Sequence, residues 1–268
     1  MRSTLVATLV LVATQAHADR ADPDDIADLA DLGDLVRRPL VLGEGGLDLR
    51  LTAEINLQPR FVARPLSLAP DAWWGISPRW TIGLVHSNAS LDRIDAGATL
   101  CVHDSPISTC NRLYRGSGLD VRFSARAGAL AIAPRVRVLV RDLDPFKPAI
   151  TLGALVRWSH GRFAIAGDPY LRLPLANHSL GNRAALVVPL WLAVQPARGW
   201  ELAVHTGYDA DLVVLRDDGH IPVGLAVTAR ATRELDVRVL AGWSRLLGPQ
   251  HDVQRAAVMI TAGWHRER

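Results

Sequence analysis

The sequence predicts an all-β fold, an antiparallel up-and-down β-barrel of about twelve strands that crosses a lipid bilayer. Three observations predict this fold. Runs of alternating apolar and polar residues fill the chain from residue 47 almost to its end. The connections between these runs alternate between short turns and long loops. Aromatic residues gather at one end of the apolar faces.

The first 18 residues have the features of a signal peptide. Arg2 gives a positive start, residues 5–13 are almost wholly apolar, and AHA at 16–18 is a small-x-small cleavage site. The chain is therefore expected to be exported and to lose this segment.

The strand LDLRLTAEINL at 47–57 alternates without a break, with Leu49, Leu51 and Ile55 on one face and Asp48 and Glu54 on the other. Eleven similar runs follow, most of them about 9–12 residues long, which suits a tilted strand that crosses a bilayer. No stretch of the mature region approaches the ~18 uncharged apolar residues of a spanning helix. The predicted strands are 47–57, 66–76, 79–88, 119–127, 130–141, 149–159, 162–174, 183–195, 200–209, 221–230, 235–244 and 255–265.

Short turns follow every second strand and longer connections lie between them, which predicts a barrel with short turns on one rim and long loops on the other. The predicted short turns are Ser77-Pro78, Gly128-Ala129, His160-Gly161, Pro196 to Gly199, and Ala231 to Glu234. The longer connections include 142–148, 177–182, 209–220 and, as the longest, about 89–118.

Aromatic residues indicate which way the apolar face points. A soluble barrel would scatter them through its core, whereas indole and phenol rings in a bilayer lie at the headgroup level. Six aromatic residues lie beside the short-turn rim on the apolar face of their strands, and we expect them to form an aromatic girdle in contact with lipid: Trp74, Trp80, Trp158, Phe163, Trp200 and Trp264.

The opposite face is charged, and we expect it to line the lumen. Its arginines are Arg50, Arg122, Arg126, Arg135, Arg137, Arg141, Arg157, Arg172, Arg230 and Arg238, and its acids are Asp48, Glu54, Asp120, Asp168, Glu201, Asp209 and Asp236. Because a twelve-strand interior is not wide, salt bridges could nearly close it. The alternative is a narrow pore whose surplus of arginine favours small anions.

In this layout the chain resembles the Gram-negative outer-membrane β-barrel proteins, in a porin-like form, over about residues 47–265. The resemblance implies a location in the outer membrane, a short-turn rim on the periplasmic side, and insertion by the barrel-assembly machinery. Many such proteins end on a Phe, whereas this chain ends ITAGWHRER, so that Gly263-Trp264 would serve in its place. The expected organisation is a signal peptide at 1–18, an acidic periplasmic segment at 19–46 and the barrel at 47–268.

The acidic segment opens with DRADPDDIADLADLGDLV, in which seven aspartates up to Asp34 face a single base, Arg20. Beside a lumen with surplus arginine, this segment could dock in the barrel mouth as a plug. A loosely helical or disordered periplasmic tail is the alternative.

Cys101 and Cys110 lie in the longest loop, and a close pair in an exported protein most simply forms a disulfide. Without a CxxC motif or a histidine cluster, no metal site is expected. We expect the disulfide to shorten an extracellular loop. The other interpretation is a rigid docking tip, because long loops on rigid scaffolds carry recognition.

A catalytic role finds little support. Outer-membrane phospholipase A also has twelve strands and uses Ser, His and Asn, but His86, Ser87 and Asn88 are adjacent here and would point to opposite faces. Glu201, His205 and Asp209 share the lumenal face, but same-face neighbours along a strand are ~7 Å apart and these residues are two such steps apart. We therefore expect no catalytic residue and no cofactor.

The predicted function is passive: a narrow pore, or a structural surface barrel, formed by a monomer. A phospholipase-like barrel hydrolase and a soluble secreted lipocalin-like barrel with a small ligand are the alternatives. The net charge is +3, but the arginines are spread singly along strands, so nucleic acid is not an expected partner. The expected partners are outer-membrane lipid, the barrel-assembly machinery and small anionic solutes.

Overall fold

The structure, a computed structural model, describes residues 34–57, 62, 66–86, 100–103, 116–249 and 256–266, without the side chains of 100–103. The predicted signal peptide lies outside these residues. The strands are β1 Leu47–Asn56, β2 Leu66–Ser77, β3 Trp80–Val85, β4 Leu100–His103, β5 Ser117–Phe123, β6 Leu130–Leu143, β7 Phe146–His160, β8 Phe163–Gly167, β9 Tyr170–Pro174, β10 Ala185–Ala197, β11 Trp200–Asp211, β12 Ile221–Arg230, β13 Leu235–Leu247 and β14 Ala256–Arg266. The helical turns are η1 Leu35–Arg37, η2 His178–Leu180 and α4 Leu215–Asp218.

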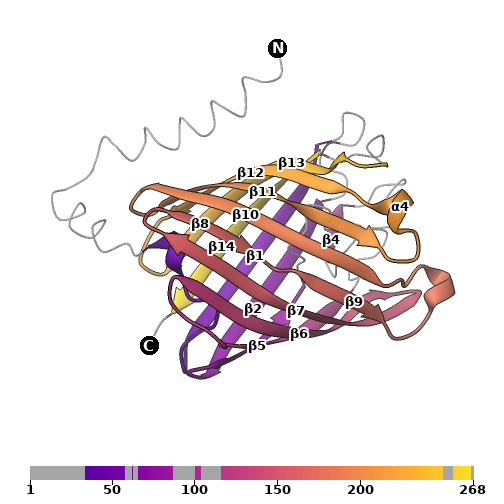
Figure 1. Cartoon of the computed structure of the whole chain (residues 1–268), viewed down its shortest axis with the longest axis horizontal. Coiled ribbons are helices and arrows are strands. Elements are labelled where there is room, and N and C mark those ends of the chain that lie inside the picture. The colour runs from indigo at the N-terminus through magenta and orange to yellow at the C-terminus, as the bar shows by residue number, and fades with distance from the viewer. Residues whose placement is uncertain are drawn as a thin grey trace, which may run out of the picture.

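These labelled strands form one closed antiparallel barrel of twelve strand positions, here called staves, as the sequence predicts (Figure 1). The barrel closes where β1 pairs with β14, in a register that runs from Leu47 opposite Arg266 to Asn56 opposite Ala257. On its other side β1 pairs with β2. Closure leaves no open edge in the ring of twelve barrel strands that the structure describes, so their ladders satisfy the backbone N–H and C=O groups without water, as a bilayer requires.

Two of the fourteen labelled strands do not add a stave. Strands β8 and β9 are two halves of one stave, because both pair with β7 and with β10. Strand β4 pairs with β2 at Leu66–Leu68, beyond the end of the β2–β3 ladder, and lies within the predicted connection 89–118.

The break between β8 and β9 differs from the continuous strand predicted at 162–174. It falls at Asp168-Pro169, where proline has no N–H to give to the ladder. The carbonyl of Pro169 accepts a bond from Ala154 N at 3.1 Å, and Asp168 N donates to Pro189 O at 3.2 Å. The neighbouring strand has Gly153 at this point, where a Cβ would lie 2.3 Å from the Pro169 carbonyl oxygen. The break therefore needs both the proline and the glycine.

The predicted alternation of connections is largely present. Short turns join β2 to β3, β7 to β8, β10 to β11 and β12 to β13, all at one rim. At the opposite rim the predicted loop 142–148 is shorter than expected, because β6 and β7 continue until Leu143 pairs with Phe146.

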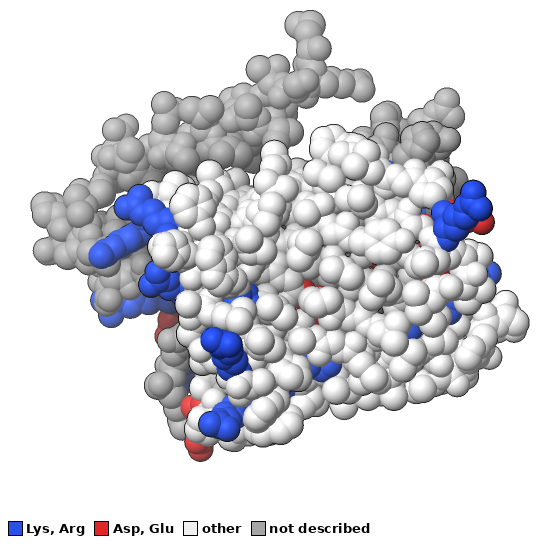
Figure 2. All heavy atoms as spheres, in the orientation of Figure 1, with Lys and Arg blue, Asp and Glu red and all other residues white. Residues whose placement is uncertain are grey.

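The side chains are arranged with the polar face inside. Along β6, Arg135 and Arg137 are buried, whereas Val136 and Val138 are exposed. Figure 2 shows a face of the barrel that is mostly uncharged, with Lys and Arg gathered mainly at its left-hand end. An apolar outer surface around a charged interior is the arrangement that lipid, rather than water, stabilises. Among the described residues, no helix is long and apolar enough to cross a bilayer.

Five of the six predicted girdle residues are exposed on this outer surface: Trp74, Trp80, Trp158, Phe163 and Trp200. Trp264 is partly buried, and its indole Nε1 donates to Glu234 at 2.9 Å. All six lie near the short-turn rim, and their role as a girdle at the bilayer surface stays a prediction.

A charge in the middle of the apolar belt tests whether that belt faces lipid. Leu225 lies midway along β12 and is 67% exposed, and we expect Leu225→Arg to lower the free energy of unfolding in vesicles by about 2–4 kcal/mol. Val213 is 70% exposed but follows the end of β11, so Val213→Arg is a matched control with little expected effect. Urea unfolding followed by tryptophan fluorescence measures both. Equal stability of the two variants would exclude a lipid-facing belt.

Candidate functional site

The centre of the lumen is held by one arginine between two carboxylates. Arg135 of β6 donates from Nε to Asp120 of β5 at 2.7 Å and from Nη2 to the same carboxylate at 3.1 Å. Its Nη1 pairs with Asp168, the residue at the break between β8 and β9. Both aspartates are essentially inaccessible to solvent. Since an unpaired buried charge is costly, this cluster fixes the staves on either side of β6 and β7.

Trp73 of β2 is an inward-facing aromatic that joins the same cluster. Its indole Nε1 donates to Asp120 Oδ2 at 2.8 Å. The guanidinium carbons of Arg50 and Arg122 lie 5.1 Å and 4.7 Å from its ring centroid, within cation–π range. Arg122 also reaches Asp120, with Nε 2.8 Å from Oδ2. The ring thereby holds two positive charges beside the cluster.

A cavity of about 240 Å³ lies in the lumen next to this cluster. Five arginines and two aspartates contribute to its lining, together with Trp73, Trp191 and uncharged residues. The charged residues of the lining are Arg50, Arg122, Arg135, Arg137, Arg238, Asp71 and Asp168. The cavity is therefore lined by a surplus of positive charge.

Two of these arginines have hydrogen-bonding capacity left over. Arg137 is 3% exposed, donates from Nε to Thr151 at 3.0 Å and lies 4.4 Å over the Tyr170 ring, yet its Nη2 is buried without a partner among the described atoms. The Nε of Arg238 is likewise buried without a partner in the described part of the chain. Buried donors of this kind favour an anion or water in the adjacent space.

The chain just before β1 crosses the barrel mouth at the short-turn rim. Residues 34–46, called the strap here, include η1, which lies at the left-hand end of the barrel in Figure 1. Leu35 and Val36 are buried, and both of their backbone N–H groups point to Gln195 Oε1 of β10, at 2.9 and 3.4 Å. Leu42 N donates to Thr81 of β3 at 2.8 Å. The strap therefore contacts strands on several sides of the mouth.

Its end is packed tightly against β2. Gly45 N donates to Gly75 O at 2.8 Å, and Gly75 N donates to Gly46 O at 2.9 Å. A Cβ on Gly75 would lie 1.9 Å from the carbonyl oxygen of Gly43. Only glycine at position 75 allows the strap to lie this close to the barrel wall.

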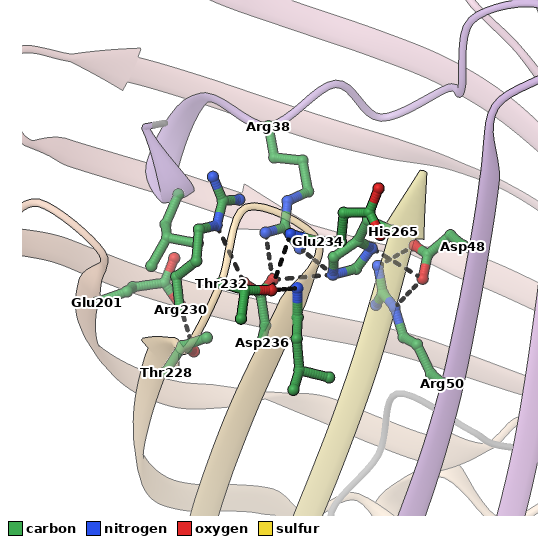
Figure 3. A network of polar contacts seen from close by, with 12 residues as sticks. Arg38, Asp48, Arg50, Glu201, Thr228, Arg230, Thr232, Glu234, Asp236 and His265 are labelled. Atoms are coloured by element: carbon green, nitrogen blue, oxygen red, sulfur yellow. Dashed lines mark hydrogen bonds and ion pairs between the residues drawn. The ribbon is translucent and has the colours of Figure 1, made fainter. Parts of the chain in front are cut away.

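Arg38 fastens the middle of the strap to the seam of the barrel (Figure 3). Its guanidinium pairs with Asp236 of β13, and its Nη1 lies 3.0 Å from His265 Nε2 of β14. His265 in turn lies 2.9 Å from Asp236 and 3.1 Å from Asp48 of β1. Burial lowers the pKa of the Arg38 guanidinium, while the Asp236 carboxylate opposes this shift.

Beside the strap, the mouth contains a second and larger cavity of about 770 Å³. Its charged lining residues are Arg37, Arg126 and Arg157, and none of the described residues that line it is a carboxylate. Arg157 is 8% exposed and donates from Nη1 to the Arg38 carbonyl, while its Nε is buried without a partner among the described atoms. We call this space the mouth cavity.

The residues predicted to face the lumen fall into three groups. The buried ones are Asp48, Glu54, Asp120, Arg135, Arg137, Arg157, Asp168 and Asp236. The partly buried ones are Arg50, Arg122, Arg141, Arg172, Glu201, Asp209, Arg230 and Arg238. Arg126 is exposed, because β5 ends at Phe123 rather than near residue 127 as predicted. Four of the residues, Asp120, Arg122, Arg135 and Asp168, come together in the central cluster.

The other sequence candidates are not brought into one site. His205 is buried beside Trp191, with ring centroids 5.2 Å apart, and Glu201 accepts a hydrogen bond from Thr228 at 3.2 Å. His86 follows the end of β3 and is buried rather than outward-facing, while Ser87 lies outside the described residues. Cys110 and the side chain of Cys101 also lie outside the described part, so the disulfide stays a prediction.

Sequence reasoning missed Trp73, Gln195 and Gly75. Alternation in the second strand assigns Trp73 to the inner face once Trp74 is assigned to the outer one, so this residue could have been found. The roles of Gln195 and Gly75 depend on contacts with the strap, and no local pattern reveals them.

No protein-family model matches the chain, and no curated protein does. Solved structures do match it. The NanC porin has a TM-score of 0.57 and 7% identity, over 81% of this chain and 98% of that one. The KdgM porin has a TM-score of 0.54 and 5% identity over the same shares, and its complex with disordered oligogalacturonate has a TM-score of 0.53 and 5% identity over 82% and 98%. At such low identity, the likeness shows that the chain has the fold of the outer-membrane porin barrels.

The central ion cluster should contribute strongly to stability. In Arg135→Gln, Asp168 loses its ion-pair partner, and we expect the free energy of unfolding in vesicles to fall by about 3 kcal/mol. The control is Arg183→Gln, because the Arg183–Asp211 pair is longer, 3.5 Å, and more exposed, and its loss should cost below about 1 kcal/mol. Urea unfolding measures both. Equal midpoints would show that the cluster is not structural.

The strap should depend on the missing Cβ of Gly75. We expect Gly75→Ala to push the strap from the wall at a cost of about 1–3 kcal/mol, and to speed proteolysis within 34–46. At Gly43, on the other side of the same contact, a Cβ would meet nothing within 4 Å, so Gly43→Ala is the control. Limited proteolysis with mass spectrometry compares them. If both variants were cleaved like the wild type, the strap would not depend on this contact.

Proposed function

We propose that the chain is a narrow, passive, anion-preferring pore of the outer membrane. The observation that carries this proposal is the lumenal cavity, lined by five arginines against two aspartates. Arginine rings favour anions at constrictions, because their charge lowers the cost of removing water from the ion. The unpartnered donors Arg137 Nη2 and Arg238 Nε give a passing anion hydrogen bonds that the protein does not already use.

The location follows from the outer surface and the fold. A continuous apolar belt on a closed barrel has no stable place in water, whereas a bilayer stabilises it. The fold of the outer-membrane porins supports the outer membrane as that bilayer. In this proposal the short-turn rim with its strap faces the periplasm, the protein is a monomer, and the barrel-assembly machinery inserts it after a signal peptide has been removed.

The pore is expected to be narrow for two reasons. The side chains of the central cluster cross the space between β2, β5, β6 and the β8–β9 break, and leave a cavity of about 240 Å³ beside them. The strap covers part of the mouth, and the open space beside it is the basic mouth cavity. A permeating solute would thus meet arginine at both levels.

One of the similar solved structures fits this chemistry. It is a KdgM porin described in complex with disordered oligogalacturonate. A small anion is the solute that the arginines here favour. A barrel hydrolase is not supported, because Glu201, His205 and the residues around them form no nucleophile–base pair among the described contacts.

Conductance in planar bilayers tests the proposal. We expect small steps, with a reversal potential in a salt gradient that indicates anion preference. Arg137→Gln together with Arg238→Gln should lower the anion-to-cation permeability ratio several-fold, because the charge and the free donors of the cavity are lost. Arg216→Gln in α4, a loop residue outside the lumenal lining, is the control and should leave the ratio unchanged.

Two outcomes would overturn the proposal. Protein shown to be folded in lipid but silent in bilayers would be a structural barrel rather than a pore. Cation-selective steps, or an equal change of selectivity in Arg216→Gln, would show that the lumenal arginines do not set the preference.

A further inference from the structure

We propose that the mouth cavity is the docking site of the acidic segment 19–33 of this same chain. The proposal concerns an interaction of the protein with itself, and it can be tested without any measurement of conduction.

The cavity has the charge that this partner requires. Its charged side chains are Arg37, Arg126 and Arg157, and the described part of the lining contains no carboxylate. Arg157 is more than nine-tenths buried and keeps its Nε unpartnered among the described atoms. No ion pair within the described chain involves Arg126, whose ladder contacts with Ile132 are made by the backbone. The described lining is therefore basic, with no anionic side chain of its own.

The segment 19–33 carries the negative charge that could balance the arginines of the mouth cavity. Between residues 19 and 33 it carries six aspartates and one arginine, a net charge of −5. Five aspartates recur at a spacing of three, Asp22, Asp25, Asp28, Asp31 and Asp34, and the apolar residues Ile26, Leu29 and Leu32 follow the same spacing. Leu40, Val41 and Ile132 offer the cavity's apolar lining to such a stripe.

The last aspartate of the series already lies at the edge of the cavity. Asp34 accepts a hydrogen bond from Val36 N at 3.2 Å and forms an ion pair with Arg37 Nε at 3.2 Å. Its carboxylate also interacts electrostatically with the guanidinium of Arg157. Since one extended residue spans about 3.3–3.6 Å, residues 28–33 can reach every part of the cavity from this anchor. The tether keeps the local concentration of the segment high, of the order of millimolar.

The test is the rate at which an Asp-specific protease removes the segment from the mature full-length protein in detergent, followed by mass spectrometry. We expect slow cleavage in the wild type at low salt and several-fold faster cleavage in Arg126→Glu, which repels the segment. Arg79→Glu is the matched control, because this exposed arginine of the same rim does not line the cavity. At about 1 M salt, where charges are screened within ~3 Å, the wild type should be cleaved as fast as Arg126→Glu.

Charge exchange gives the decisive comparison. Asp28→Arg and Asp31→Arg, added to Arg126→Glu, should restore protection at the remaining aspartates, whereas a segment that only happened to resist the protease would show no rescue. Equal cleavage rates in the wild type, Arg126→Glu and Arg79→Glu would overturn the proposal. Protection that grew with protein concentration would also overturn it, in favour of a second copy as the occupant. A silent barrel with this protection pattern would remove the proposed pore but leave the docking intact.

Discussion

The ion pairs of Arg135 with Asp120 and Asp168 are the interaction on which the lumen depends. The buried apolar clusters of this barrel are small, such as Ala203, Ala226, Leu240 and Met259. Most of the large buried side chains of its inner surface are polar or charged, so they need partners that match their charge. Asp168 lies at the break between β8 and β9, and Asp120 also accepts hydrogen bonds from Trp73 and Arg122. The cluster occupies the lumen between opposing walls and leaves open space only beside it. The space left in the lumen is thus limited by the same contacts that join the strands across it.

Much of this fold could be predicted from the sequence, and the parts that could not share a physical cause. Lipid and lumen sort side chains with a period of two, so the strands and the inward position of Arg135 and Arg137 follow from alternation alone. The break at Asp168-Pro169 depends on Gly153 and Pro189 of other strands, and alternation carries no information about them. The partners of the lumenal charges depend in the same way on the register between strands. The burial of Leu35 and Val36 under Gln195 joins residues 160 positions apart, which no local pattern reveals.

The lumen and its mouth have the same electrostatic character. Among the described lining residues, arginine outnumbers acid at each level. Each level also has a buried guanidinium N–H group without a partner among the described atoms, at Arg137 and Arg238 in the lumen and at Arg157 in the mouth. The acidic residues that balance this charge are of two kinds. Some, such as Asp120, are fixed within the wall, and the others precede the strap along the chain. A solute anion and the aspartates of the segment would therefore compete for the same donors.

The place of Arg38 has a consequence for the order of assembly. Its partners Asp236 and His265 belong to β13 and β14, which the ribosome makes last, and His265 also reaches Asp48 of β1, its direct neighbour across the seam (Figure 3). These groups come together only when the first strand has found the final one. The complete network around Arg38 can therefore form only when the barrel is closed. A chain that stalls with an open seam would keep the contacts of the strap with β2 and β3 but would lack this network.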